Sequence, residues 1–205
     1  MPAPYLLASS LQPLASPMRI GLFGGSFDPV HNGHLTLAAS CAEQGGLDAV
    51  WFVPAALQPF KLHGPVASDA DRVAMLRLGI ADMPDRDVST LEIDRGGVSY
   101  TVDTLRQIKS ELPDAELFFL MGADTLRELP GWREPDEVLR LATPMMVQRP
   151  GEADVVSDIP HVRVKMPPMD ISSSDIRRRI TIGELITHLV PPQVAAYIND
   201  QGLYR

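Results

Sequence analysis

Residues 22–37, LFGGSFDPVHNGHLTL, join an expected strand to an expected helix through a turn that opens with two glycines. The apolar run at 20–23 predicts a buried strand, and the residues after Gly24 and Gly25 lead into the spaced apolar positions of a helix. Because glycine has no Cβ, the backbone of such a turn can approach a ligand closely, and a helix start offers unbonded N–H groups. The stretch therefore predicts a strand, a phosphate-binding turn and a helix.

The same turn carries two histidines. His31 and His34 are three residues apart, which on a first helical turn places both imidazoles on one face. A single histidine is more often a surface or packed residue than a functional one, and the turn contains neither GxGxxG nor a Walker loop. The spacing also suits zinc, but Cys41 is the sole cysteine and no third ligand lies nearby in the sequence, so we expect no metal on protein ligands.

The string GGSFDPVHNGHL resembles the signature of the nucleotidyltransferase superfamily marked by HxGH, and in particular its nicotinate-nucleotide adenylyltransferase branch. A second signature of that superfamily, ISSTxIR, has a counterpart in residues 171–177, ISSSDIR, where Ser174 replaces threonine and keeps the hydroxyl. Two signatures in the expected order are more specific than either one. The resemblance extends over nearly all of residues 18–205.

Composition and charge limit the kinds of molecule that the chain can bind and the compartment that it suits. The chain has 205 residues, a formal net charge of −8 and a pI near 5.0, which argues against binding nucleic acid or a membrane surface through charge. One cysteine excludes an intramolecular disulfide and fits a reducing compartment, so we expect a cytoplasmic protein. Residues 1–17 are proline-rich and uncharged, and we expect a disordered extension before a single domain at 18–205. Whether the chain is a monomer or a homo-oligomer stays open.

Strand and helix patterns alternate along the rest of the chain. Strands are expected at 47–53, 88–93, 116–121, 144–149 and 161–166, and helices at 68–80, from 99 or 101, at 124–129, 135–141, from about 175 and at 193–199. On helix 68–80 we expect Arg72 and Arg77 to be solvated. This order predicts an α/β fold: a Rossmann-like open parallel sheet with helices on both faces and a small C-terminal helical part.

The resemblance implies cationic groups that hold phosphates, namely His31, His34, Lys61 and Arg177. A solvated surface lysine is the competing interpretation for Lys61. The resemblance and the helix-start argument together indicate contacts to ATP from nine residues: Gly24, Gly25, Ser26, Phe27, Gly33, Gly122, Asp124, Ser173 and Ser174. Asp124 could also cap the helix that it begins.

Three residues are expected to bind the acceptor substrate, two of them at its pyridine ring. The string SYTVDTL resembles the family's segment there, which implies that backbone N–H groups around Thr101 bind a carboxylate, although the same residues would also make an ordinary helix cap. The resemblance implies that Trp132 stacks on the ring, with core packing as the alternative. Arg149 is expected near the nucleotide.

The resemblance implies transfer of the adenylyl group of ATP to nicotinate mononucleotide, giving nicotinate adenine dinucleotide and pyrophosphate in NAD biosynthesis. The mononucleotide phosphate has a second pKa of about 6, so it can attack in line without a protein base. Mg²⁺ is expected on the ATP phosphates, held largely by substrate oxygens and water. The alternatives are nicotinamide mononucleotide or another phosphate acceptor, as in pantetheine-phosphate adenylyltransferases and cytidylyltransferases, or a non-catalytic nucleotide-binding module.

Overall fold

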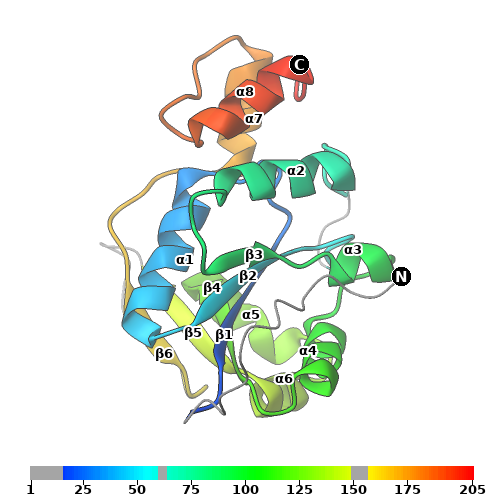
Figure 1. Cartoon of the computed structure of the whole chain (residues 1–205), viewed down its shortest axis with the longest axis vertical. Coiled ribbons are helices and arrows are strands. Elements are labelled where there is room, and N and C mark those ends of the chain that lie inside the picture. Colours follow the sequence, from blue (N-terminus) through cyan, green and yellow to red (C-terminus); the bar gives the residue numbers. More distant parts are fainter. Residues whose placement is uncertain (1–15, 60–63, 149–156) are drawn as a thin grey trace.

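The computed structural model describes residues 16–59, 64–148 and 157–205. These residues form one parallel sheet with helices on both faces (Figure 1), as the alternating pattern predicts. The strands, in the order β3-β2-β1-β4-β5-β6, are β1 (Arg19–Gly25), β2 (Ala49–Pro54), β3 (Arg86–Val88), β4 (Glu116–Gly122), β5 (Thr143–Gln148) and β6 (Val162–Lys165). The helices are α1 (Asn32–Gly45), α2 (Asp69–Gly79), α3 (Leu91–Arg95), α4 (Thr101–Glu111), α5 (Ala123–Glu128), the 3₁₀ turn η1 (Leu129–Gly131), α6 (Pro135–Leu141), α7 (Ser173–Thr181) and α8 (Pro192–Asp200).

The central strand β1 lies where the strand order reverses. It pairs in parallel with β2 on one side and with β4 on the other, so that Leu22 faces Trp51 and Phe119 in the register. In an open parallel sheet, the crevice beyond the carboxyl ends of the strands at this reversal is the usual ligand site. The glycines that end β1 and β4 therefore lie at the edge where a ligand is expected.

Alternate residues of the strands supply two separate cores. On β4, Phe118 and Leu120 pack with α1, α2 and α8, whereas Leu117 and Phe119 pack with α4, α5 and α6. Because successive side chains of a strand point to opposite faces, a strand covered on both sides is apolar throughout. This explains the unbroken apolar run of β4. Helix α8 packs on α2, and α7 and α8 lie together at one end of the molecule (Figure 1).

Serine side chains cap the starts of α2 and α7. The hydroxyl of Ser68 accepts from the N–H of Asp71 at the start of α2, and the hydroxyl of Ser172 accepts from the N–H of Asp175 at the start of α7. Ser68 and Ser172 are therefore the N-cap residues of these two helices.

The structure differs from the expected strand at 88–93 and from the expected caps of two helices, although α4 begins at Thr101 as one of the two expected starts. The expected strand 88–93 ends at Val88, and α3 follows, because Glu92 of α3 accepts a hydrogen bond from Thr104 of α4, a tertiary contact that β-propensity does not capture. Helix α4 begins after Tyr100 without a side-chain cap, since the hydroxyl of Ser99 instead accepts from the N–H of Ala56. Helix α5 begins one residue earlier than expected, and Asp124 does not cap it.

Arg72 is buried, which corrects the expectation that it is solvated. Its side chain is 0% exposed, and its guanidinium donates to the carbonyl of Ser26 at 2.6 Å, to the carbonyl of Ala55 at 2.7 Å and to the carboxylate of Asp69. A guanidinium has five N–H donors, which suits it to bridge several carbonyls. Arg72 thus ties the turn after β1 to the end of β2 and to α2.

Within the ranges that the structure describes, no helix is both long enough and apolar enough to cross a membrane.

The buried guanidinium predicts a large stability effect. Replacing Arg72 with Met keeps most of the volume but leaves two buried carbonyls without their donor, so we expect the free energy of unfolding to fall by about 3 kcal/mol. The measurement is the urea unfolding midpoint at unchanged slope. Arg77→Met, on the exposed face of the same helix, is the control and should change stability by less than ~0.5 kcal/mol. Equal stability of the two variants would contradict the structural role of Arg72.

The single cysteine, Cys41, lies on α1 and is buried in the core. Burial raises the pKa of the Cys41 thiol to about 12, so the thiol stays protonated at neutral pH. We expect no reaction of the native protein with a thiol reagent at about pH 8, and rapid reaction once urea unfolds the chain. Equal rates under the two conditions, followed by absorbance, would show that the thiol is accessible.

Candidate active site

The turn between β1 and α1 has a buried aromatic base. Phe27 adopts a left-handed backbone conformation, with φ of 49°, and its ring packs edge-on against Phe23, Phe52 and His34. A Cβ on Gly25 would lie 3.0 Å from this ring, so a side chain at that position would displace it. The second glycine is therefore required by the close approach of Phe27. Because the ring of Phe27 is buried, only the backbone of this residue could make the expected contact with ATP.

The two histidines form a reciprocal cap at the start of α1. His31 is the N-cap residue, and its Nδ1 accepts from the N–H of His34, while Nδ1 of His34 accepts from the N–H of His31, both at 3.3 Å. The rings stack with their centroids 3.6 Å apart, on one face as the spacing predicts. Because each Nδ1 is an acceptor, the proton of a neutral ring lies on Nε2. Both imidazoles are thereby prepared to donate from Nε2.

The second signature packs against the first. On α7, the hydroxyl of Ser173 donates to the carbonyl of Pro29 at 2.9 Å. The guanidinium of Arg177 donates to the carbonyl of Asp28 at 2.7 Å and to the hydroxyl of Ser174 at 3.3 Å. With its side chain 28% exposed, Arg177 retains access to solvent. The two signatures therefore meet at one place in the fold.

Asp28 anchors this junction. Its buried carboxylate accepts from the N–H groups of Val66 and Ala67 and from the hydroxyl of Tyr204 at 2.7 Å. Burial raises the pKa of Tyr204, and the hydrogen bond to Asp28 raises it further, so the phenol remains a donor. The loop before α2 and the C-terminal segment are thus both fastened to the turn.

A first cavity of about 360 Å³ opens beside the histidines, at the carboxyl ends of β4 and β5. The expected site residues that line it are His31, Gly33, His34, Gly122, Asp124 and Ser173. Asp124 extends into solvent, with its side chain 89% exposed, and is paired with Arg127. Imidazole donors, the first residues of α1 and the serines of α7 therefore surround one space, which suits a polyphosphate.

A second cavity of about 410 Å³ lies next to the first, and Thr125 lines both. Its walls include Thr101 at the start of α4 and Trp132, whose ring packs edge-on against Phe119 at 5.5 Å. Gly24 and Gly25, which we expected at ATP, line this second cavity. An aromatic wall opposite a helix N-terminus suits a flat ring that carries a negative group.

Four expected residues lie beside the first cavity rather than among its lining residues. Ser26 and Phe27 belong to the turn, and Ser174 and Arg177 belong to α7. Lys61 and Arg149 lie outside the described residues.

Several lining residues of the second cavity were missed in the sequence. Glu92 is buried there and accepts from the hydroxyl of Thr104 at 2.7 Å, and the same hydroxyl accepts from Arg95 at 2.8 Å. Tyr100 and Thr125 also line it. Thr125 directly follows the GAD string and could have been found from it, whereas the others depend on how α3 and α4 pack.

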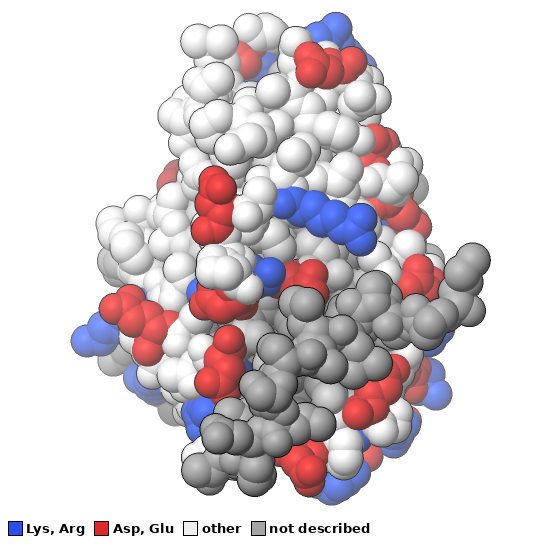
Figure 2. Space-filling view, in the orientation of Figure 1, with Lys and Arg blue, Asp and Glu red and all other residues white. Residues whose placement is uncertain are grey.

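The electrostatics of the site are local. Figure 2 shows acidic and basic side chains interspersed over the described part of one face, without a broad area of one sign. The residues that the structure describes contain no group of three or more His, Cys, Asp or Glu that could hold a metal ion. Around the cavities, the imidazoles and the helix starts are groups that could hold an anionic ligand.

The comparisons with known proteins agree with this geometry. The sequence model of the cytidylyltransferase-like family matches residues 22–179. A probable nicotinate-nucleotide adenylyltransferase of Thermus thermophilus is 46% identical over 188 residues, which cover 92% of this chain and 100% of the relative. Its counterpart in Geobacillus thermodenitrificans is 41% identical over 186 residues, which cover 91% of this chain and 86% of the relative.

A solved structure has the same fold. Plasmodium falciparum nicotinic acid mononucleotide adenylyltransferase complexed with NaAD superposes with a TM-score of 0.76 at 21% identity, covering 91% of this chain and 97% of that one. At 21% identity this likeness shows the fold alone. The family is assigned from the sequence relatives and the family model. The chain therefore belongs to the cytidylyltransferase-like family and, within it, to the nicotinate-nucleotide adenylyltransferases.

Proposed function

We propose that this chain transfers the adenylyl group of ATP to nicotinate mononucleotide, forming nicotinate adenine dinucleotide and pyrophosphate in NAD biosynthesis. The observation that carries the proposal is the pair of adjoining cavities that share Thr125. One is lined by phosphate-binding groups and the other by Trp132 and the start of α4. A dinucleotide whose two halves occupy these cavities would place its phosphates between them, beside the turn.

The chemistry needs charge stabilisation rather than a protein base. The phosphate of the mononucleotide is mostly dianionic at neutral pH and attacks the α-phosphorus of ATP in line, while the bond to pyrophosphate breaks. Nε2 of His31 and of His34, together with the N–H groups at the start of α1, stabilise the charge that develops on the α-phosphoryl group and on pyrophosphate. Holding two anions in line supplies much of the remaining acceleration.

Further cations complete the phosphate site in this proposal. Arg177 donates to the turn through part of its guanidinium and has remaining N–H groups for phosphate oxygens. Lys61 is assigned to the same phosphates and Arg149 to the nucleotide, on the resemblance of their segments. ATP enters as its Mg²⁺ complex, in which the metal is held by substrate oxygens and water.

The second cavity receives the pyridine ring. The face of Trp132 stacks on the ring, and the N–H groups at the start of α4, around Thr101, bind the carboxylate. A helix N-terminus favours a negative group, which supports nicotinate over nicotinamide as the substrate. Gly122, Asp124 and the serines of α7 then contact the ATP half.

The first test is substrate choice. We expect pyrophosphate release from ATP and Mg²⁺ with nicotinate mononucleotide, and a much lower kcat/KM with nicotinamide mononucleotide or phosphopantetheine, because those acceptors lack the carboxylate. Turnover with a different acceptor alone would retain the phosphate site and reject the pyridine assignment. ATP binding without turnover of any acceptor would instead support a binding module.

The second test concerns the histidine pair. We expect His34→Ala to lower kcat by about 100- to 1,000-fold, since one preorganised donor to the transition state is removed. His34→Asn keeps a side-chain acceptor for the helix cap, and melting temperatures of both variants separate loss of folding from loss of chemistry. His188→Ala is the control, because its imidazole is exposed and only its backbone carbonyl contacts Asn32. Wild-type turnover in folded His34→Ala would exclude the role.

A further inference from the structure

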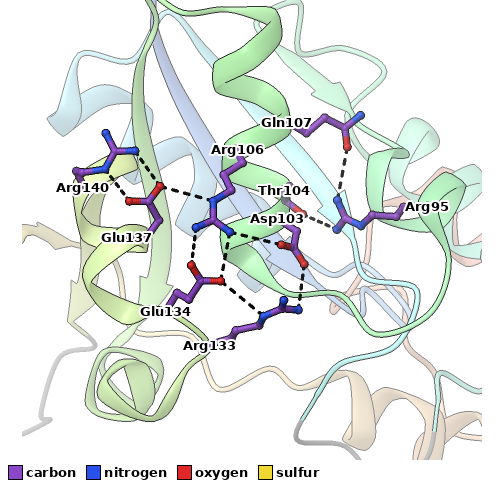
Figure 3. Close-up of polar contacts among 9 residues, drawn as sticks. All are labelled: Arg95, Asp103, Thr104, Arg106, Gln107, Arg133, Glu134, Glu137 and Arg140. Atoms are coloured by element: carbon purple, nitrogen blue, oxygen red, sulfur yellow. Dashed lines mark hydrogen bonds and ion pairs between the residues drawn. The ribbon is translucent and has the colours of Figure 1, made fainter.

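A network of ion pairs joins α4 to the residues that follow Trp132 (Figure 3). Asp103 and Arg106 are three residues apart on α4, whose first residue lines the second cavity. Residues 132–134, which we name the Trp132 segment, lead into α6, and the first two of them also line this cavity. The network therefore connects the two walls between which a pyridine ring would lie.

Arg106 makes most of these contacts. Its two terminal nitrogens bond the two carboxylate oxygens of Glu134, one of them at 3.2 Å, and its Nε lies 3.6 Å from Glu137 of α6. A further pair at 4.0 Å joins it to Asp103. A guanidinium with two parallel bonds to a carboxylate fixes orientation as well as distance. Arg106 thus fixes both the position and the orientation of the Glu134 carboxylate.

The other partner in the network is Arg133. It lies 3.5 Å from Asp103 and 3.7 Å from Glu134, and its guanidinium stacks on the ring of Tyr100 at 4.8 Å. Tyr100 and Arg133 both line the second cavity. The residues on each side of the cavity are consequently held to each other by charge and by a cation–π contact.

The backbone of the Trp132 segment requires such restraint. Glu134 adopts a left-handed conformation, with φ of 52° and ψ of 58°, which side chains other than glycine rarely adopt. Trp132 itself contributes no polar anchor, since its buried Nε1 has no hydrogen-bond partner among the described residues. Its place depends on the edge-on contact with Phe119 and on the backbone of its own segment. Backbone hydrogen bonds from the N–H of Trp132 to Leu129 and from α6 to the carbonyl of Glu134 hold the ends of the segment. Arg106 adds the paired side-chain contact to Glu134.

We propose that Arg106 is a positioning residue for the pyridine ring, which it reaches through Glu134 by fixing Trp132 opposite Tyr100 and Thr101. This inference rests on the proposed function. Arg106 lies outside the first cavity, so its effect falls on the mononucleotide and leaves ATP binding and the chemical step unchanged. Its hydrogen bond to Glu134 raises the pKa of Arg106 and lowers that of Glu134, so both groups stay charged over the working pH range.

The experiment compares Arg106→Gln with Arg140→Gln in the full chain. We expect Arg106→Gln to raise KM for nicotinate mononucleotide roughly 5-fold, the effect of one partly exposed ion pair, with kcat and KM for ATP unchanged. Arg140 is the matched control. It lies on α6 and bonds Glu137 of the same helix at 2.6 Å, but in the described structure it does not contact the Trp132 segment. Its variant should keep both KM values.

A double variant tests the route through Glu134. Glu134→Gln should raise KM for the mononucleotide as Arg106→Gln does, and combining the two should add nothing further, because both remove the same contact. An unchanged KM in Arg106→Gln, or an equal rise for ATP and the mononucleotide, would overturn the positioning role. Absence of turnover with nicotinate mononucleotide in the wild-type enzyme would instead reject the proposed function, and this inference with it.

Discussion

The turn between β1 and α1 has its backbone carbonyls held by side chains from distant helices. Arg72 of α2 bonds the carbonyl of Ser26, and Arg177 and Ser173 of α7 bond the carbonyls of Asp28 and Pro29. A turn that binds an anion through N–H groups must have its carbonyls occupied elsewhere, because a carbonyl oriented toward the ligand would repel it. These contacts occupy carbonyls of the turn, as the proposed phosphate site requires.

The sheet topology places the rest of the site around this turn. Because β1 lies at the reversal of strand order, the helices that follow β1 and β4 start at the same edge. The groups proposed to bind phosphate lie on the helices that cover one face of the sheet. The aromatic wall lies with the helices that cover the other face. The two cavities meet at Thr125. In the proposed function, each cavity receives one half of the dinucleotide product and recognises it with its own side chains.

Much of this arrangement could be predicted from the sequence. Alternating apolar runs and the turns between them indicated the parallel sheet and most helices, because those signals are local in the chain. The burial of Arg72 could not be predicted, since an arginine on an amphipathic helix usually faces water, and only the carbonyls of Ser26 and Ala55 make its burial favourable. The pairing of Arg106 with Glu134 joins positions 28 residues apart, beyond any helical repeat.

The turn after β1 is held by contacts from the C-terminal part of the chain. The contacts from Ser173, Arg177 and Tyr204 to the turn span 144, 149 and 176 positions of the sequence. Contacts of such separation form late, because a long stretch of chain must be closed before they form. A folding intermediate that has built the sheet without docking α7 would contain both histidines but lack a prepared turn. Phosphate binding would then depend on the docking of α7, a part of the chain far from the turn in sequence.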